Sequence, residues 1–152
     1  MDETLRGQLD QAHEHRVGGN YDAAKALYQE VLEGDRQCAE ACFWLGYTEM
    51  MGFGEFGLGL DLMRKGAGLS PEVPRFHFEL AKAYLMLGDD EAGKELLLHV
   101  VRTWPGTREA QEAEKQLTYF PDVAPGSLPG SGASAAADGE CDPDGGSRVC
   151  DL

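Results

Sequence analysis

The chain has 152 residues, a formal net charge of −14 and 42% hydrophobic residues. This length suits one domain with a substantial core, and no apolar run is long enough to span a bilayer. The acidic balance argues against nucleic acid and anionic membranes as main partners, because both are bound through Lys and Arg side chains. The composition therefore favours a soluble protein that binds neither nucleic acid nor an anionic membrane.

The amino-terminal segment and the cysteines bear on cellular location. The segment carries acids and lacks the apolar stretch of a secretory signal, so we expect a cytoplasmic location. Reduced thiols are the default there, and the uneven spacing of the cysteines does not indicate a disulfide framework. The cysteines are Cys38, Cys42, Cys141 and Cys150.

Three glycines, Gly19, Gly54 and Gly88, stand at turns and are separated by 35 and 34 residues. Glycine is favoured after a helix because it adopts the left-handed conformation without strain. The helices between these turns are too short to be stable alone, so each must bury an apolar face against a neighbour. The spacing therefore predicts helical hairpins that repeat about every 34 residues.

The first unit, residues 5–38, has a clear second helix and a polar first helix. Tyr21, Ala24, Tyr28 and Val31 follow the turn at the spacing of one helical face. We expect the first helix to be a polar cap, as terminal repeats often are. Its polar or small positions are Gln8, Gln11, Ala12 and His15.

The second unit, residues 39–73, places small residues between large ones. Leu45 and Gly46 stand in its first helix, and Gly59 and Gly66 in its second. Small side chains let two helices cross closely, so bulkier replacements there are expected to loosen the hairpin. Four glycines fall within the second helix, Phe56 to Leu69, and each interior Gly costs about 0.5–1 kcal/mol relative to Ala. We expect this helix to be the least protected of the array.

The third unit, residues 74–107, is the clearest pair of amphipathic helices. Gly88 and the two aspartates after it end one helix and begin the next. Apolar residues then recur at spacings of three and four on each side of the turn. They are Phe76, Leu80, Ala83, Tyr84 and Leu87 before it, and Ala92, Leu96, Leu97, Val100 and Val101 after it.

One more helix is predicted after Pro105, followed by a change in composition. Thr107 is a favoured N-cap residue, and a thin stripe of Ala110, Ala113 and Leu117 suits a helix that covers the end of a repeat array. We expect Tyr119 and Phe120 to fold back onto it. Residues 121–152 are rich in Gly, Ala, Ser, Pro and Asp, which predicts a disordered acidic tail.

These positions resemble the tetratricopeptide repeat family. In the third unit, Leu80-Ala81, Tyr84, Gly88, Gly93, Leu97, Val100 and Pro105 match its pattern of large, small and turn residues. The resemblance implies an all-α fold, a tetratricopeptide-type α-α superhelix of three helical hairpins plus a C-terminal capping helix. The implied domain covers 4–120, with repeats at about 5–38, 39–73 and 74–107, and a capping helix at 107–119.

In this family the first helices of successive hairpins line a concave groove, which implies a peptide-binding site here. Aromatic and Met side chains suit an extended peptide or an amphipathic helix, and the basic residues could pair with acids. Alternatively, Phe43, Trp44 and Tyr47 belong to the core between repeats. The implied groove residues are Leu9, His13, Arg16, Phe43, Tyr47, Met50, Met51, Arg75, Phe78, Lys82 and Met86.

One known chemistry of the family does not fit. Members that bind the acidic tails of heat-shock chaperones use a clamp of Lys, Asn and Arg side chains around two carboxylates. Only Arg75 fits this clamp, and a Glu at position 79 would repel a carboxylate. The corresponding positions are Leu9, His13, Trp44, Arg75 and Glu79.

A closer resemblance is to the small, acidic, three-repeat chaperones of type III secretion translocators. It is carried by Pro74 to Phe78 and by Cys42 to Gly46, and it implies that an extended client segment lies in the groove. Those proteins resemble one another in a longer amino-terminal helical extension, whereas here the repeats start almost at Met1.

Catalytic and metal sites are not expected. His13 and His15 point to different helical faces, no nucleophile has a base at a recognisable spacing, and no cofactor motif is present. A zinc site would need the cysteines of the tail to fold back onto Cys38 and Cys42. The tail acids imitate a calcium loop but lack flanking helices. The sequence therefore predicts no enzyme, no cofactor and no metal site.

The predicted function is a non-catalytic interaction scaffold or adaptor that binds a peptide or helix of a protein partner. Two alternatives stay open: a cytoplasmic chaperone of secreted translocator proteins, and self-assembly into a homo-oligomer through the same apolar surface.

Overall fold

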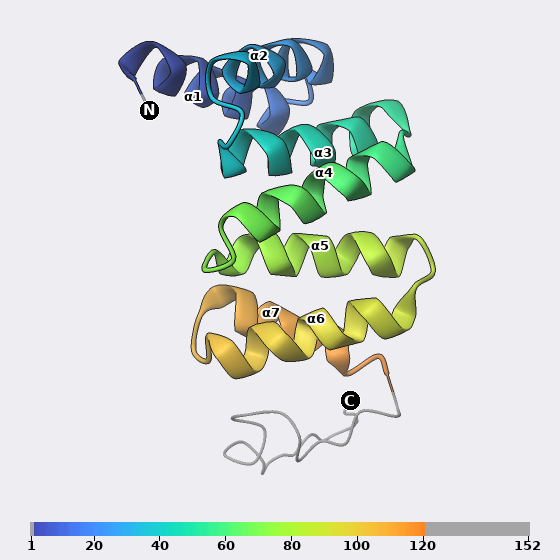
Figure 1. Cartoon of the computed structure of the whole chain (residues 1–152). Helices are drawn as coiled ribbons and strands as arrows, with labels where there is room; N and C mark the ends of the chain where they lie inside the picture. The colour runs from blue at the N-terminus through green and yellow to red at the C-terminus, as the bar shows by residue number, and fades with distance from the viewer. Residues whose placement is uncertain (1, 121–152) are drawn as a thin grey trace. The chain divides into compact units, whose positions relative to one another are not determined.

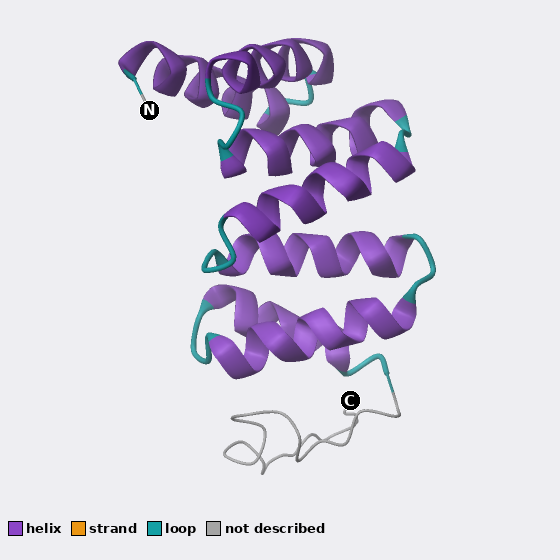
Figure 2. Cartoon of the chain, viewed as in Figure 1, coloured by secondary structure: helices purple, strands orange, loops and turns teal. Residues whose placement is uncertain are grey.

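The computed structural model describes residues 2–120, which form seven α-helices and no strand (Figure 2). The all-α prediction is confirmed for these residues. None of their helices has the length and apolarity needed to cross a bilayer. The chain divides after Ala83 into two compact units, which are described separately. The predicted tail, 121–152, lies outside the described residues.

The first unit begins with a hairpin of α1 (Glu3–Val17) and α2 (Tyr21–Gly34). Asp2 caps α1, where its side chain accepts a hydrogen bond from the Leu5 N–H at 2.8 Å. Both helices lie next to α3 (Ala39–Phe53) in the first unit (Figure 1). Apolar side chains from these three helices form one buried cluster. Its buried members are Leu9, Ala12, Ala24, Tyr28, Val31, Cys38, Ala41 and Leu45.

The second hairpin joins α3 to α4 (Phe56–Leu69), and its helices approach closely at glycines. A Cβ atom built on Gly46 would lie 2.5 Å from the Gly59 carbonyl oxygen, and one on Gly66 would lie 2.7 Å from the Phe43 backbone nitrogen. Gly54 ends α3 with a φ of 68°, a conformation that glycine adopts without strain. The predicted turn and the predicted close crossing are both confirmed.

Helix α5 (Pro74–Met86) crosses the division between the two units, and its first part packs with the first unit. Phe76 stacks on Phe43 of α3 with ring centroids 4.3 Å apart. The chain then turns at Gly88, whose φ is 89°, as the sequence predicts.

The second unit consists of the end of α5 followed by α6 (Asp90–Thr103) and α7 (Arg108–Leu117), which pack together. Thr107 caps α7 by accepting a hydrogen bond from the Ala110 N–H at 3.1 Å. The predicted stripe on α7 is buried, which agrees with a capping helix. Phe120 lies near Lys94 of α6, but Tyr119 is 78% exposed, so the expectation that both residues fold back is corrected for Tyr119.

Candidate functional site

Aromatic side chains from α1, α3 and α5 meet around Trp44 in the first unit. The Trp44 ring is in edge contact with Tyr47 at 5.3 Å and with Phe43 at 5.0 Å. Wider contacts join it to His13 of α1 and Phe76 of α5, both at 6.4 Å between centroids. We call the surface formed by His13, Arg16, Trp44 and Tyr47, together with Met51 one helical turn after Tyr47, the aromatic face.

Arg16 holds α1 against the aromatic residues of α3. Its guanidinium carbon lies 3.9 Å from the centroid of the Trp44 ring, a close cation–π contact. Its Nε–H also donates a hydrogen bond of 3.1 Å to the hydroxyl oxygen of Tyr28. The ring face of Trp44 and the hydroxyl oxygen of Tyr28 together fix the position of the Arg16 guanidinium.

Tyr28 and Glu40 complete a polar chain behind the aromatic face. His13 Nδ1 lies 2.7 Å from the Tyr28 hydroxyl, and His13 Nε2 lies 3.5 Å from a carboxylate oxygen of Glu40. Since Arg16 already donates to Tyr28, the hydroxyl can donate to Nδ1 and leave the His13 proton on Nε2, facing Glu40. Arg6 donates to the other Glu40 oxygen at 3.1 Å.

These contacts displace the pKa values of the groups involved. Hydrogen bonding from His13, followed by that from Arg6, lowers the pKa of Glu40 below its ordinary value. Burial raises the pKa of Tyr28 to about 12, although the Arg16 hydrogen bond acts in the opposite direction. Burial also raises the pKa of Tyr47, and Glu79 contributes to that rise. Both tyrosines are therefore neutral at physiological pH.

Three cations near the aromatic face, Arg6, Arg75 and Lys82, are already paired with acids of this chain, whereas Arg16 is held by Trp44 and Tyr28. Glu79, whose side chain is 12% exposed, lies 3.0 Å from Arg75 and 3.3 Å from Lys82. On the α1 side, Glu40 forms an ion pair with Arg6 in the same way. The sequence-based idea that these cations serve an acidic ligand is therefore weakened, because such a ligand would compete with an internal carboxylate at each position.

Four of the predicted groove residues lie in the interior. Leu9 belongs to the buried cluster of the first hairpin, and Phe43 is covered by Phe76. Met50 faces α4, where a Cβ on Gly59 would lie 3.0 Å from the Met50 Cβ. Phe78 is buried beside Arg75 and Lys82. The set of predicted contact residues is therefore smaller, because these four buried side chains lie beneath the aromatic face and support it.

The other predicted residues are at least partly accessible. His13, Arg16, Tyr47 and Arg75 are half-buried, and Lys82 and Met51 are exposed. Met86, also exposed, follows Ala83 and is described with the second unit.

Sequence reasoning left Trp44, Tyr28 and Glu40 out of the candidate set. The sequence left open whether Trp44 lines the groove or belongs to the core between repeats. In the structure it is half-buried at the centre of the aromatic face. Tyr28 was assigned to packing, since a helical pattern shows burial but not the partner of a hydroxyl. The contacts from Tyr28 to His13 and Arg16 span 15 and 12 residues, and no local motif reports them.

Among residues 2–120, no group of three or more His, Cys, Asp or Glu side chains is arranged to hold a metal ion. The zinc alternative needed Cys141 and Cys150 beside Cys38 and Cys42, and the calcium alternative lay wholly in the tail, so both depend on residues outside that range.

Residues 9–52 match the model of a family described as tetratricopeptide repeat, so the resemblance to that family is confirmed over this segment. No significant relative was found among curated proteins. Among solved structures, the chain is similar to the Yersinia enterocolitica type III secretion chaperone SycD, crystallised with a peptide of the translocator YopD. The identity is 20%, the TM-score is 0.66, and the match covers 78% of this chain and 90% of that chain.

Two further structures share this fold. PcrH in complex with the chaperone binding region of PopD is 22% identical with a TM-score of 0.67, over 78% of this chain and 92% of that one. The O-GlcNAc transferase of Thermobaculum terrenum is 26% identical with a TM-score of 0.70, over 82% of this chain but only 24% of that one. The tetratricopeptide-type hairpin fold is therefore shared by peptide-binding chaperones and by part of a transferase.

Proposed function

We propose that this protein is a non-catalytic adaptor that binds a peptide or a helix of a protein partner on the aromatic face. The observation that carries the proposal is the half-buried pair Trp44 and Tyr47, fixed by Arg16 and flanked by Met51, which is 48% exposed. Rigid aromatic rings beside a flexible Met side chain offer apolar contact area at low entropic cost.

The charges around the aromatic face restrict the class of ligand. Because Glu40 and Glu79 already neutralise Arg6, Arg75 and Lys82, and the Arg16 guanidinium is held by Trp44 and Tyr28, a strongly acidic peptide gains little there. An apolar segment that is extended or helical avoids this competition. We infer that the ligand presents apolar side chains to Trp44 and Tyr47 and polar groups to the rim.

The domain boundaries expected from the sequence remain part of the proposal. Three repeats at about 5–38, 39–73 and 74–107 with a capping helix would act as one interaction domain in the cytoplasm. The proposed site keeps His13, Arg16, Tyr47, Met51, Arg75 and Lys82 of the first unit, with Trp44 added at its centre, and leaves out Met86, which belongs to the second unit.

A selected peptide provides the test. Peptides enriched on the purified protein from a random display library are measured by fluorescence anisotropy against the wild type and Tyr47→Glu. A carboxylate among the aromatic rings must be desolvated when the peptide binds, so we expect affinity at least about tenfold lower.

Tyr119→Glu is the matched control, because it makes the same exchange at an exposed tyrosine in the second unit. It should bind the selected peptide as the wild type does. Equal affinity for Tyr47→Glu, with circular dichroism showing an intact helical fold, would exclude the aromatic face as the site.

A second candidate is a chaperone of type III secretion translocators. The observation in its favour is that the match spans about nine-tenths of SycD and of PcrH, so that almost all of each chaperone is represented here. Co-expression with translocator subunits of the source organism should then yield a stable complex that Tyr47→Glu disrupts. Translocators that stay insoluble beside the soluble wild-type protein would count against this role.

Self-assembly is the third candidate, since Phe53, Phe56 and Leu58 are exposed around the α3–α4 turn. Light scattering over a range of concentrations separates a monomeric adaptor from an oligomer.

A further inference from the structure

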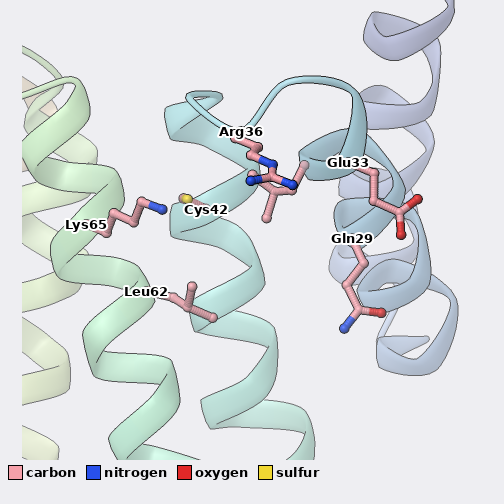
Figure 3. Close-up of a pocket in the computed structure, with 7 residues that line it drawn as sticks. Gln29, Glu33, Arg36, Cys42, Leu62 and Lys65 are labelled. Atoms are coloured by element: carbon pink, nitrogen blue, oxygen red, sulfur yellow. The ribbon is translucent and has the colours of Figure 1, made fainter.

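A second candidate site lies away from the aromatic face, in an open cleft of about 570 Å³ within the first unit. Figure 3 shows its walls, with α2 on one side and α4 on the other. The loop after α2 and the first turn of α3 complete the lining. The lining residues are Gln29, Leu32, Glu33, Arg36, Cys42, Leu62 and Lys65.

Two cations of this cleft lack a hydrogen-bond or ion-pair partner among the described residues. Within the part of the chain that the structure describes, neither Arg36 nor Lys65 forms a hydrogen bond or an ion pair, and both are exposed. The chain has 27 acidic and 13 basic residues, so unpaired cations are unexpected. By contrast, Lys25 and Arg75 each lie within 3.2 Å of a carboxylate.

Arg36 and Lys65 come from different elements and line the same cleft. In Figure 3 the Lys65 side chain extends from α4 toward Cys42, and Arg36 extends over the cleft from the loop on the other side. The charge of Lys65 acts on Cys42 and opposes the rise that burial causes in the pKa of that thiol. An anionic group held in the cleft would therefore have two cationic donors in the lining, one from the loop after α2 and one from α4.

The remainder of the lining is largely apolar. Leu32 and Leu62 are half-buried and Cys42 is buried, so together they give the cleft an apolar floor. Gln29 and Glu33 stand on the α2 wall, where they can accept hydrogen bonds from backbone N–H groups. A small inorganic anion would leave the apolar floor uncovered. The lining fits a ligand with an acidic group next to apolar ones.

We propose that this cleft binds an acidic, Leu-containing peptide segment of a protein partner, with a carboxylate between Arg36 and Lys65 and an apolar side chain on Leu32 and Leu62. Charge complementarity selects this occupant, because the lining holds two cations against the one carboxylate of Glu33, and neither cation forms an ion pair with any described residue. The site is independent of the aromatic face and takes a ligand of different chemistry, so one partner could contact both or two partners could bind together.

The test uses a defined probe. An eight-residue fluorescein-labelled peptide that alternates Leu with Asp or Glu is titrated into the full chain, and its counterpart carries Asn and Gln in place of the acids. We expect saturable binding of the acidic peptide and at least about tenfold weaker binding of the amide peptide, because charge-assisted hydrogen bonds are lost.

Charge reversal locates the site. The double variant Arg36→Glu with Lys65→Glu should weaken the acidic peptide at least about tenfold. The matched control, Arg64→Glu with Arg102→Glu, changes the net charge equally at two exposed positions outside the cleft lining and should have a small effect. Tyr47→Glu should also leave this binding unchanged, whatever it does to a ligand of the aromatic face.

Three results would overturn the proposal. The first is failure of the wild type to bind the acidic peptide at millimolar concentration. The second is equal weakening by both double variants, which would show nonspecific attraction. The third is loss of binding in Tyr47→Glu alone, which would move the peptide to the aromatic face.

Discussion

The two hairpins of the first unit share one topology but are held together by different means. Helices α1 and α2 meet through side chains, with Tyr28 fully buried between them and its hydroxyl bonded to α1. Helices α3 and α4 come into backbone contact at Gly46 and Gly59, where no side chain separates them.

This difference predicts different sensitivities. A hairpin joined by side chains loses stability when a side chain is shortened, because a cavity or an unpaired polar group results. A hairpin joined through glycines loses stability when a side chain is added, since backbone cannot move aside cheaply. The first hairpin should therefore tolerate added volume better than the second, and the following experiments test this contrast.

Gly46→Ala should have the largest effect. The new methyl group would lie 2.5 Å from the Gly59 carbonyl oxygen and 2.8 Å from the Met63 nitrogen, both backbone atoms of α4. We expect a loss of about 2–3 kcal/mol in the free energy of unfolding, measured by urea denaturation. Gly7→Ala in α1 is the control, because nothing lies within 4 Å of its Cβ position. A similar stability for both variants would refute the backbone contact.

Tyr28→Phe tests the side-chain contact of the first hairpin. Without the hydroxyl, Arg16 Nε loses its acceptor and His13 Nδ1 loses its partner, at a part-buried site. We expect a loss of about 1–2 kcal/mol in the same assay. Tyr21→Phe removes a hydroxyl that has no hydrogen bond within residues 2–120 and should change stability little. Equal effects of the two variants would mean that the network contributes nothing.

Gly57→Ala and Gly68→Ala should stabilise α4. Both positions are exposed and a Cβ there would meet no atom within 4 Å, unlike Gly59 and Gly66. Each change should add at most about 0.5–1 kcal/mol by reducing the conformational freedom of the unfolded chain. Hydrogen exchange should show α4 as the least protected helix in the wild type and slower exchange in the variants. Destabilisation by either change would show that these glycines have a packing role.

Glu40→Gln should have the smallest effect and a distinct pH dependence. The Glu40 side chain is 42% exposed, so solvent screening limits its pairing with Arg6 to a few tenths of a kcal/mol. Its pKa in the folded state is below the ordinary 4.5, so its stabilisation is present above that pH and is lost as pH falls through the lowered pKa. Urea denaturation between pH 7 and pH 3 should show the wild type and the variant converging on acidification. A difference that grows below pH 4.5 would contradict this linkage.

Sequence reasoning located the helices well because their signals are local. Gly19, Gly54 and Gly88 all have positive φ values, and Thr107 caps α7 as expected. These features depend on residues within one turn of each other, so a pattern in the chain is enough to reveal them.

The candidate site was harder to predict because burial depends on contacts between distant helices. Leu9, Phe43 and Met50 occupy the same stripes as the accessible His13 and Tyr47, yet they are interior. Residues on one stripe differ in burial only because the neighbouring helix covers some of them and not others. Periodicity identifies a face and leaves open which part of that face stays uncovered.

The sequence by itself determined the class of fold, the repeat of about 34 residues and the turns, because helical periodicity and glycine chemistry are properties of short segments. Only the tertiary structure decided which aromatic residues are accessible, which carboxylates neutralise Arg6, Arg75 and Lys82, and which cations stay unpaired in the cleft of Arg36 and Lys65. The physical reason is that charge pairing and solvent exposure arise between side chains from different helices, which packing alone brings together.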